Sequence, residues 1–179
     1  MAKAMDAFSA SLMADKREII FAPTVYKFEN FAQMAEEFKL NDRDVVLTNE
    51  FIYKPFMEEL GLKCQFVFQE KFGAGEPSEA MIQTMYDAIP YDSYDRVIAV
   101  GGGAIMDLCK LLGCKRPDTV HNLYFKRFPV VHEKDVIAIP TTCGTGSECT
   151  NISVAIVKDE KDGVLTGGET TLGLVSDAI

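Results

Sequence analysis

The sequence predicts an α/β fold in which helices cover both faces of a parallel sheet. Short, continuously apolar runs such as Val97–Val100 fit strands that are buried on both faces. Segments with apolar residues at helical spacing alternate with these runs along the chain. Glycine-rich loops follow two of the runs. Ligands of such sheets bind at the carboxyl ends of the strands, so these loops are candidates for a binding site.

The first predicted elements are an extended segment, a helix and a strand. Residues 19–28 are expected to be extended, with a turn at Pro23. The strand Asp44–Thr48 is predicted from its apolar run. Between them a helix is predicted to begin near Asn30, because the apolar residues that follow share one helical face: Phe31, Met34, Ala35 and Phe38.

The next predicted elements are two helices separated by a strand. Asn49 is placed to cap a helix that runs to Leu60, and Pro55 suits the first turn of that helix rather than its interior. Cys64–Phe68 is expected to be a strand. After a loop, Ser78 suits the N-cap of a helix whose buried face consists of Met81, Ile82, Met85 and Ile89.

Three glycines then join a strand to a helix. The strand Arg96–Val100 runs directly into Gly101–Gly103, and apolar residues repeat at helical spacing beyond them, as at Ile105 and Leu108. Such a helix start presents free backbone N–H groups and the positive end of the helix dipole, which together can hold a pyrophosphate. The standard G-x-G-x-x-G pattern is absent because Met106 stands where the third glycine belongs.

The residues between the glycine helix and the next strand are expected to form a surface excursion without chemistry. They include Arg116–Asp118 and Lys126–Arg127. His121 and His132 also lie here, with no acidic neighbours at ligand spacing. Packed or solvated histidines are therefore favoured over a metal site.

A second loop follows the predicted strand Val136–Ile139. Residues 139–148 read IPTTCGTGSE, with two glycines and four hydroxyl side chains, and Glu148 is expected to open a helix. Glycine lets backbone N–H groups approach a ligand closely, and hydroxyls both donate and accept hydrogen bonds. The sequence therefore favours a ligand-facing loop, with a long polar turn whose hydroxyls bond one another as the alternative.

The two loops together resemble those of the iron-dependent (group III) alcohol dehydrogenases, where GGGS-x-x-D and P-T-T-x-x-T-G-S-E flank a dinucleotide. The matching residues here are GGGAIMD at 101–107 and IPTTCGTGSE at 139–148. The resemblance extends over about residues 20–179. Within the family, three segments resemble the branch that acts on 4-hydroxybutyrate: 47–56, 68–78 and 141–155.

The resemblance implies a Rossmann-like, dehydroquinate synthase-like dinucleotide-binding domain at residues 19–179, preceded by an N-terminal extension at residues 1–18. The implied reaction is the NAD-dependent interconversion of 4-hydroxybutyrate and succinate semialdehyde, in which Fe²⁺ or Zn²⁺ stabilises the developing alkoxide. In the family the metal ligands lie in a helical half that this sequence lacks. The isolated chain is therefore expected to bind no catalytic metal and to be inactive.

The resemblance also implies a role for each loop. Pyrophosphate is expected on the backbone of Gly101, Gly102, Gly103 and Ala104, where Ala104 replaces a usual serine. Hydroxyl contacts to phosphate, ribose or nicotinamide are expected from Thr141, Thr142, Thr145 and Ser147, with Thr142 the strongest candidate. Asp107 matches the family aspartate; it is either a ligand contact, a stabiliser of the first helical turn or a loop anchor.

Two further positions depart from the family pattern. Asn49 stands where many members have an Asp that accepts a hydrogen bond from the adenosine ribose and repels a 2′-phosphate. The charge argument for NAD over NADP is therefore lost, so the resemblance implies NAD with NADP not excluded, and Glu50 is a candidate for the missing carboxylate. Thr171 stands where the family usually has a Lys near the nicotinamide ribose, with Lys158 and Lys161 as substitutes.

Two other functions remain open. A non-catalytic dinucleotide-binding or assembly module, encoded by a truncated dehydrogenase gene, is the main alternative. A related metal-dependent lyase or sugar-alcohol dehydrogenase would share the GGG loop, but the TTCGTGSE loop argues against it.

Composition restricts the partners. The net charge of −9 and a pI near 4.7 disfavour nucleic acid and anionic membrane surfaces. No apolar run approaches the roughly 18 residues of a membrane helix, so a cytoplasmic protein is expected. The five cysteines include no C-x-x-C pair, which argues against a disulfide scaffold and a zinc site. A dinucleotide and a small alcohol or aldehyde are the expected partners, with a homo-oligomer left open.

Overall fold

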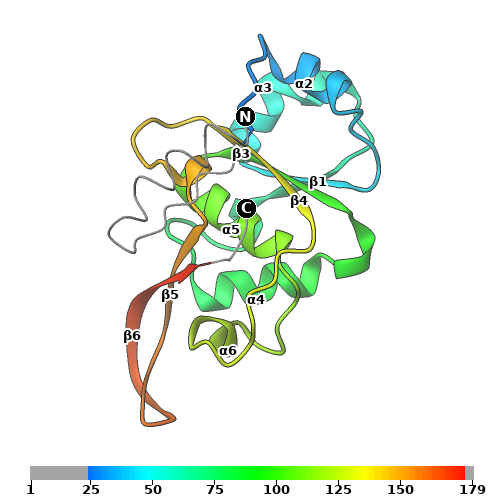
Figure 1. Cartoon of the computed structure of the whole chain (residues 1–179). Helices are drawn as coiled ribbons and strands as arrows, with labels where there is room; N and C mark the ends of the chain where they lie inside the picture. The colour runs from blue at the N-terminus through cyan, green and yellow to red at the C-terminus, as the bar shows by residue number, and fades with distance from the viewer. Residues whose placement is uncertain (1–23, 176–179) are drawn as a thin grey trace, which may run out of the picture.

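The computed structural model describes residues 24–175, which form a four-stranded parallel sheet with helices on both faces and a two-stranded antiparallel hairpin (Figure 1). The strand order in the parallel sheet is β2-β1-β3-β4. The predicted fold class is confirmed. The helices and strands are α2 (Phe31–Glu37), β1 (Asp44–Thr48), α3 (Glu50–Phe56), β2 (Gln65–Phe68), α4 (Glu79–Ala88), β3 (Arg96–Gly101), α5 (Gly103–Gly113), α6 (Val120–Tyr124), β4 (Asp135–Pro140), β5 (Ile152–Lys161) and β6 (Val164–Val175).

Side chains of the central strands alternate between two apolar cores. Val45 and Leu47 face the core that contains residues of α4, α5 and α6. Val46 and Ile98 face the second core, to which α2 and α3 contribute. Because successive side chains of a strand point to opposite faces, a run that is apolar at every position is buried from both sides. This is why β1 and β3 lack the alternation of an exposed strand.

Two predicted helix starts are confirmed by their caps. The Asn30 side chain accepts a hydrogen bond from Gln33 N at 2.9 Å at the start of α2. Ser78 Oγ accepts one from Met81 N at 3.2 Å at the start of α4. Each cap satisfies a backbone N–H that the first helical turn leaves without a partner. Of the predicted extended segment, residues 19–23 lie outside the described part, and residues 24–28 have no regular secondary structure.

The helix after Asn49 is shorter than predicted. α3 ends at Phe56, and a 3₁₀ turn at Glu58–Leu60 follows it. Pro55 lies at the end of this helix and not in its first turn, so that prediction was wrong. Proline cannot donate the next backbone hydrogen bond, which is consistent with a helix that stops one residue later. Asn49 occupies the N-cap position, but its side chain makes no hydrogen bond to the helix.

The predicted surface excursion after α5 contributes several residues to the core, although most of it is partly or fully exposed. It contains the five-residue helix α6, whose Val120, Leu123 and Tyr124 are buried among residues of α4 and α5. Thr119 caps this helix by accepting a hydrogen bond from Asn122 N at 3.1 Å. A helix of little more than one turn is too short to show a helical period in the sequence.

Residues 152–175 form an antiparallel hairpin and do not continue the alternation of strand and helix. The turn residues Asp162 and Gly163 have φ of +53° and +83°, as a two-residue hairpin turn requires. The Asp-Gly pair was therefore the sequence signal for this element. Glu148 lies in a short 3₁₀ turn, Ser147–Cys149, and no α-helix starts there, so the prediction of a helix at Glu148 is also wrong.

The cysteines divide into a buried and an exposed group. Cys64, Cys109 and Cys114 are buried, whereas Cys143 and Cys149 are exposed. Burial raises the pKa of the Cys64 thiol to about 11 and raises the pKa of the Cys109 thiol further. Buried thiols of this kind stay protonated and unreactive.

Candidate functional site

The strand order places a topological switch point between β1 and β3. From β1 the chain continues to β2 on one side, and β3 lies on the other side. The following helices, α3 and α5, pack on opposite faces of the sheet. Ligands of open α/β sheets bind outside the carboxyl ends of the strands at such a point. Here a hydrogen bond of 2.8 Å from Thr48 Oγ1 to Val100 O joins the two strand ends.

The two predicted loops pack against each other at this edge. Thr141 N donates to Gly101 O at 2.9 Å, directly after the paired part of β3 and β4. A Cβ atom on Gly102 would lie 3.3 Å from Thr142 Oγ1. The absence of side chains in one loop therefore makes room for the hydroxyl side chains of the other.

Gly103 has little room for a side chain beside the second loop. A Cβ atom there would lie 3.2 Å from Thr145 Cγ2 and 3.3 Å from Ser147 Oγ. A larger side chain would have to push the second loop away from the start of α5. The structure thus brings together seven of the residues predicted from the sequence: Gly101, Gly102, Gly103, Thr141, Thr142, Thr145 and Ser147.

The start of α5 offers backbone donors without acceptors in the helix. Gly102 is the N-cap and has no side chain to cap with, and Met106 N donates to Gly102 O at 3.1 Å. The N–H groups of Gly103 and Ala104 come before this first helical bond. Together with the positive end of the helix dipole they fit a phosphate group. The partly buried Ala104 contributes only its backbone.

The hydroxyls of the second loop are mostly available to a ligand. Thr141, Thr142 and Thr145 are exposed, and Ser147 is partly buried. Thr145 Oγ1 accepts a long hydrogen bond of 3.4 Å from Ser147 N. Within residues 24–175 the hydroxyls of Thr141 and Thr142 bond to no protein group. This is the opposite of a polar turn whose hydroxyls satisfy one another.

Asp107 acts as an anchor inside the protein. It lies in the second turn of α5, so a role in the first turn is excluded. Its Oδ1 accepts from Lys110 Nζ at 3.1 Å, and its Oδ2 accepts from Val154 N at 3.1 Å. Lys110 also donates to Thr150 Oγ1 at 3.1 Å. The pair ties the exit of the second loop to α5, and a contact of Asp107 with a nucleotide remains a prediction.

Lys110 was missed in the sequence. Its signal was a lysine three residues after Asp107 on a helix that is otherwise apolar. Such a lysine is expected to be buried only with a partner.

A carboxylate does lie beside Asn49, and it belongs to Glu70. Asn49 Nδ2 donates to Glu70 Oε1 at 3.0 Å, and Glu50 N donates to the same oxygen at 3.1 Å. The Glu50 carboxylate lies 3.6 Å from Lys54 Nζ on the outer side of α3. Glu70 is the second residue after β2, in a 3₁₀ turn at Gln69–Lys71. The sequence offers Glu50 as a carboxylate beside Asn49, but nothing in it points to Glu70.

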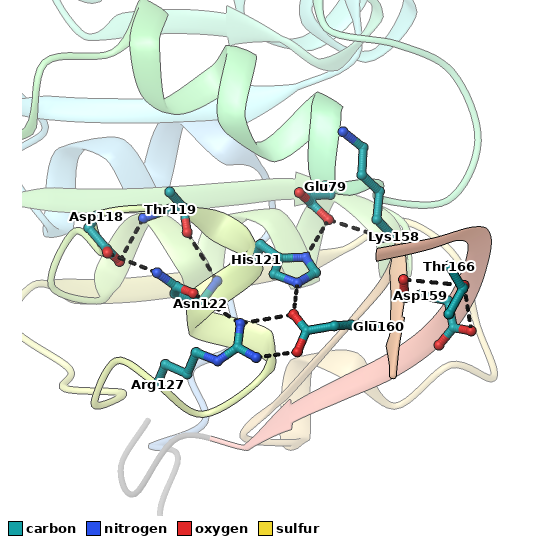
Figure 2. A network of polar contacts seen from close by, with 10 residues as sticks. All are labelled: Glu79, Asp118, Thr119, His121, Asn122, Arg127, Lys158, Asp159, Glu160 and Thr166. Atoms are coloured by element: carbon teal, nitrogen blue, oxygen red, sulfur yellow. Dashed lines mark hydrogen bonds and ion pairs between the residues drawn. The ribbon is translucent and has the colours of Figure 1, made fainter. Parts of the chain in front are cut away.

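His121 lies in a polar network that joins the hairpin to the core (Figure 2). Its Nδ1 lies 3.2 Å from Glu79 Oε2 and its Nε2 lies 2.8 Å from Glu160 Oε2. Arg127 binds the same Glu160 carboxylate, and Lys158 N donates to Glu79 Oε2 at 3.0 Å. The contacts tie α4, α6 and β5 together. Within residues 24–175 no group of three or more His, Cys, Asp or Glu side chains is arranged to hold a metal ion.

The residues considered for the family lysine all lie on the hairpin. Thr171 pairs with Ile156, and Lys158 pairs with Glu169. Lys161 is the last residue of β5, next to the hairpin turn. Figure 1 shows the hairpin leading away from the loop after β4. All three residues thus belong to the hairpin, and a contact of any of them with a nucleotide remains a prediction.

Comparison with known proteins points to one family. The family described as iron-containing alcohol dehydrogenase matches residues 20–172. The 4-hydroxybutyrate dehydrogenase of Clostridium kluyveri is 47% identical over 137 residues, which are 76% of this chain and 37% of that enzyme. A mitochondrial hydroxyacid-oxoacid transhydrogenase of Xenopus laevis is 32% identical over 114 residues, 58% of this chain and 25% of that protein.

Solved structures share the fold. An iron-containing alcohol dehydrogenase from Thermotoga maritima matches with a TM-score of 0.63 at 24% identity, over 89% of this chain and 45% of that one. A sulfoacetaldehyde reductase from Bifidobacterium kashiwanohense, solved in complex with NAD⁺, matches with a TM-score of 0.60 at 20% identity, over 87% and 44%. The chain thus spans less than half the length of these relatives.

The described residues include no helix that is both long and apolar enough to cross a membrane. The family match covers the whole of the sheet, both loops and most of the hairpin. The chain therefore belongs to the iron-containing alcohol dehydrogenase family.

Proposed function

We propose that residues 19–179 form the dinucleotide-binding domain of an alcohol dehydrogenase that interconverts 4-hydroxybutyrate and succinate semialdehyde with NAD. The contact between the two loops at the carboxyl ends of β3 and β4 carries this proposal, because it brings free backbone N–H groups close to exposed hydroxyls. The identity of 47% to a 4-hydroxybutyrate dehydrogenase supports the choice of substrate.

In this proposal the two loops divide the dinucleotide between them. The backbone of Gly101–Gly103 and Ala104 binds the pyrophosphate at the start of α5. The hydroxyls of Thr141, Thr142, Thr145 and Ser147 bind phosphate, ribose or nicotinamide. Thr142 is the strongest candidate for a direct contact, because its side chain lies beside Gly102 and its hydroxyl has no partner in the described protein.

The described residues do not fit the metal of the reaction, because they contain no suitable group of three ligands. We therefore assign to this chain the binding and orientation of the cofactor. The part of the reaction that depends on Fe²⁺ or Zn²⁺ is assigned to other residues of the complete enzyme.

The experiment is a titration of the 179-residue chain with NADH, followed by calorimetry or by nicotinamide fluorescence. Binding is expected in the wild type. Gly103→Val should weaken it at least tenfold, because its side chain would force the loops apart. Gly168→Val is the matched control, since a Cβ atom on this exposed hairpin residue would have its nearest neighbour at an ordinary 3.5 Å. Equal NADH affinity in the two variants would refute the pyrophosphate assignment.

A further inference from the structure

Asn49 and Glu70 come from two different strand ends and meet beside the glycine loop. β1 lies between β2 and β3 in the sheet, and Thr48 pairs with Phe68 at the carboxyl ends of β1 and β2. Glu70 follows β2 and reaches across to Asn49, which follows β1. The next strand on the other side, β3, carries Gly101–Gly103. A carboxylate therefore lies one strand away from the proposed pyrophosphate site.

The hydrogen bonds fix the orientation of this carboxylate. The Asn49 side-chain amide and the Glu50 backbone N–H both donate to Glu70 Oε1. The other oxygen, Oε2, has no protein donor within residues 24–175, and Glu70 is exposed. An ionised carboxylate only accepts, so Asn49 must turn its NH₂ group to Glu70 and its own oxygen away. At the end of β1 the pair thus keeps two acceptors without a protein donor among residues 24–175, Glu70 Oε2 and Asn49 Oδ1, and the first carries charge.

Two charged side chains near Glu70, those of Glu50 and Lys71, make contacts with other residues. The Glu50 carboxylate lies near Lys54 Nζ at 3.6 Å. The Lys71 ammonium lies over the Phe68 ring, 5.2 Å from its centroid. Among these four charged side chains, only Glu70 is held by Asn49 at the strand end.

An acidic side chain at this place distinguishes two forms of a dinucleotide. With the pyrophosphate on a glycine loop, the adenosine ribose lies over the end of the adjacent strand, where an acidic residue binds the 2′-hydroxyl in NAD enzymes. A 2′-phosphate would instead bring negative charge against the carboxylate and be repelled. In this structure the glycine loop follows β3, and the neighbouring strand at the switch point is β1. The residue after β1 is Asn49, where the family pattern has an aspartate.

We propose that Glu70, held in place by Asn49, selects NAD over NADP. The two residues replace the strand-end aspartate that the chain lacks: Glu70 supplies the charge and Asn49 positions it. This inference rests on the proposed function, because it needs the dinucleotide to bind at the two loops.

The test compares dissociation constants for NADH and NADPH in the 179-residue chain and two variants. Wild type should bind NADH at least tenfold more tightly than NADPH. Glu70→Gln removes the charge but keeps an oxygen for Asn49 and Glu50 N, so it should lower this preference about tenfold, mainly by improving NADPH binding. Glu50→Gln removes a carboxylate of the next helix and should leave the preference unchanged.

The outcomes show whether the selectivity assignment fails alone or together with the proposed function. If wild type binds NADH but Glu70→Gln keeps the same preference, the inference is overturned and the proposed function stands. A loss of preference in Glu50→Gln alone would also overturn it. If wild type binds neither cofactor, both proposals fail.

A second variant covers the case in which Glu70→Gln does not fold. Asn49→Ala combined with Glu70→Ala removes both side chains of the pair, so neither is left facing a missing partner. Thermal unfolding checks that the double variant is folded. The same loss of preference for NADH is then expected, and an unchanged preference would overturn the inference.

Discussion

Asp107 and Lys110 form an ion pair in a helix that is otherwise apolar. They are only 7% and 6% exposed. Asp107 also holds Val154 N, and Lys110 also donates to Ile152 O at 2.7 Å. Because each charge is satisfied by the other and by the start of β5, the pair fixes the position of the second loop relative to α5.

Replacement of one partner should be far more harmful than replacement of both. Asp107→Ala is expected to lower the free energy of unfolding by about 3–5 kcal/mol, because it leaves the Lys110 ammonium buried without a counter-ion. Adding Lys110→Met should restore a large part of the loss. Urea denaturation of the two single variants and the double variant measures this coupling. If the losses of stability in the two single variants add up in the double variant, the two side chains do not act as an ion pair.

The same variants test whether Asp107 contacts the cofactor. A folded Asp107→Ala variant with unchanged stability and no NADH binding would instead show a direct contact with the nucleotide.

At the residue scale, the sequence identified the residues that meet in the two loops better than the side chains that hold the surrounding elements in place. Gly102, Gly103 and Thr142 could be named because loop composition and family resemblance both pointed to them. The contact of Glu70 with Asn49 depends on how β1 and β2 pair, and nothing near Asn49 in the sequence indicates it. The role of Lys110 likewise depends on the position of β5.

At the element scale, strong periodic signals were predicted well and short or atypical elements were not. β1 matches its predicted range, and β3 extends one residue beyond the prediction. The helix α6 was missed because it has five residues. The hairpin was missed because the alternation of strand and helix was extended past β4, although the Asp-Gly turn signalled antiparallel pairing.

The attachment of the hairpin should depend on pH through His121. Burial lowers the pKa of His121, but hydrogen bonds with Glu160 and Glu79 outweigh it and leave the pKa above the ordinary 6.5. Hydrogen bonds from Arg127 and His121 lower the pKa of Glu160 from 4.5 to about 2. The His121 contribution is full below pH 6.5 and is lost as the pH rises through the raised pKa. The Glu160 contribution is present above pH 4.5 and is lost as the pH falls toward 2.

The network should therefore contribute most between about pH 4.5 and pH 6.5. His121→Gln should lower the free energy of unfolding more at about pH 5.5 than at about pH 8.5, as measured by urea denaturation. His132→Gln is the control. Burial lowers the pKa of His132, so its contribution is lost as the pH falls and its variant should show the reverse trend. An equal effect of His121→Gln at both pH values would contradict the ion-pair role.

At the scale of the whole molecule, cofactor binding and catalysis should be separable. We expect the 179-residue chain to bind NADH without taking up one iron or zinc per chain and without oxidising 4-hydroxybutyrate. The physical reason is that the described residues hold no three-ligand group, so the developing alkoxide would lack several kcal/mol of charge stabilisation. Elemental analysis measures the bound metal, and NADH absorbance measures the oxidation of 4-hydroxybutyrate.

A fusion provides the positive control for this expectation. Joining the chain to the remaining part of the Clostridium kluyveri enzyme should restore metal uptake and oxidation of 4-hydroxybutyrate. One bound metal and turnover in the unfused chain would show that ligands exist among its own residues, with His121 and His132 the first to replace.

Because the cysteines differ in burial, the rates at which they react with a thiol reagent report on the opening of the core. A thiol-specific reagent should modify Cys143 and Cys149 quickly, whereas Cys64, Cys109 and Cys114 react only when the core exposes them. The slow phase then measures the equilibrium between closed and open core without any denaturant. The fast phase reports on the second loop, because a nucleotide bound beside Thr142 would shield the neighbouring Cys143 from the reagent.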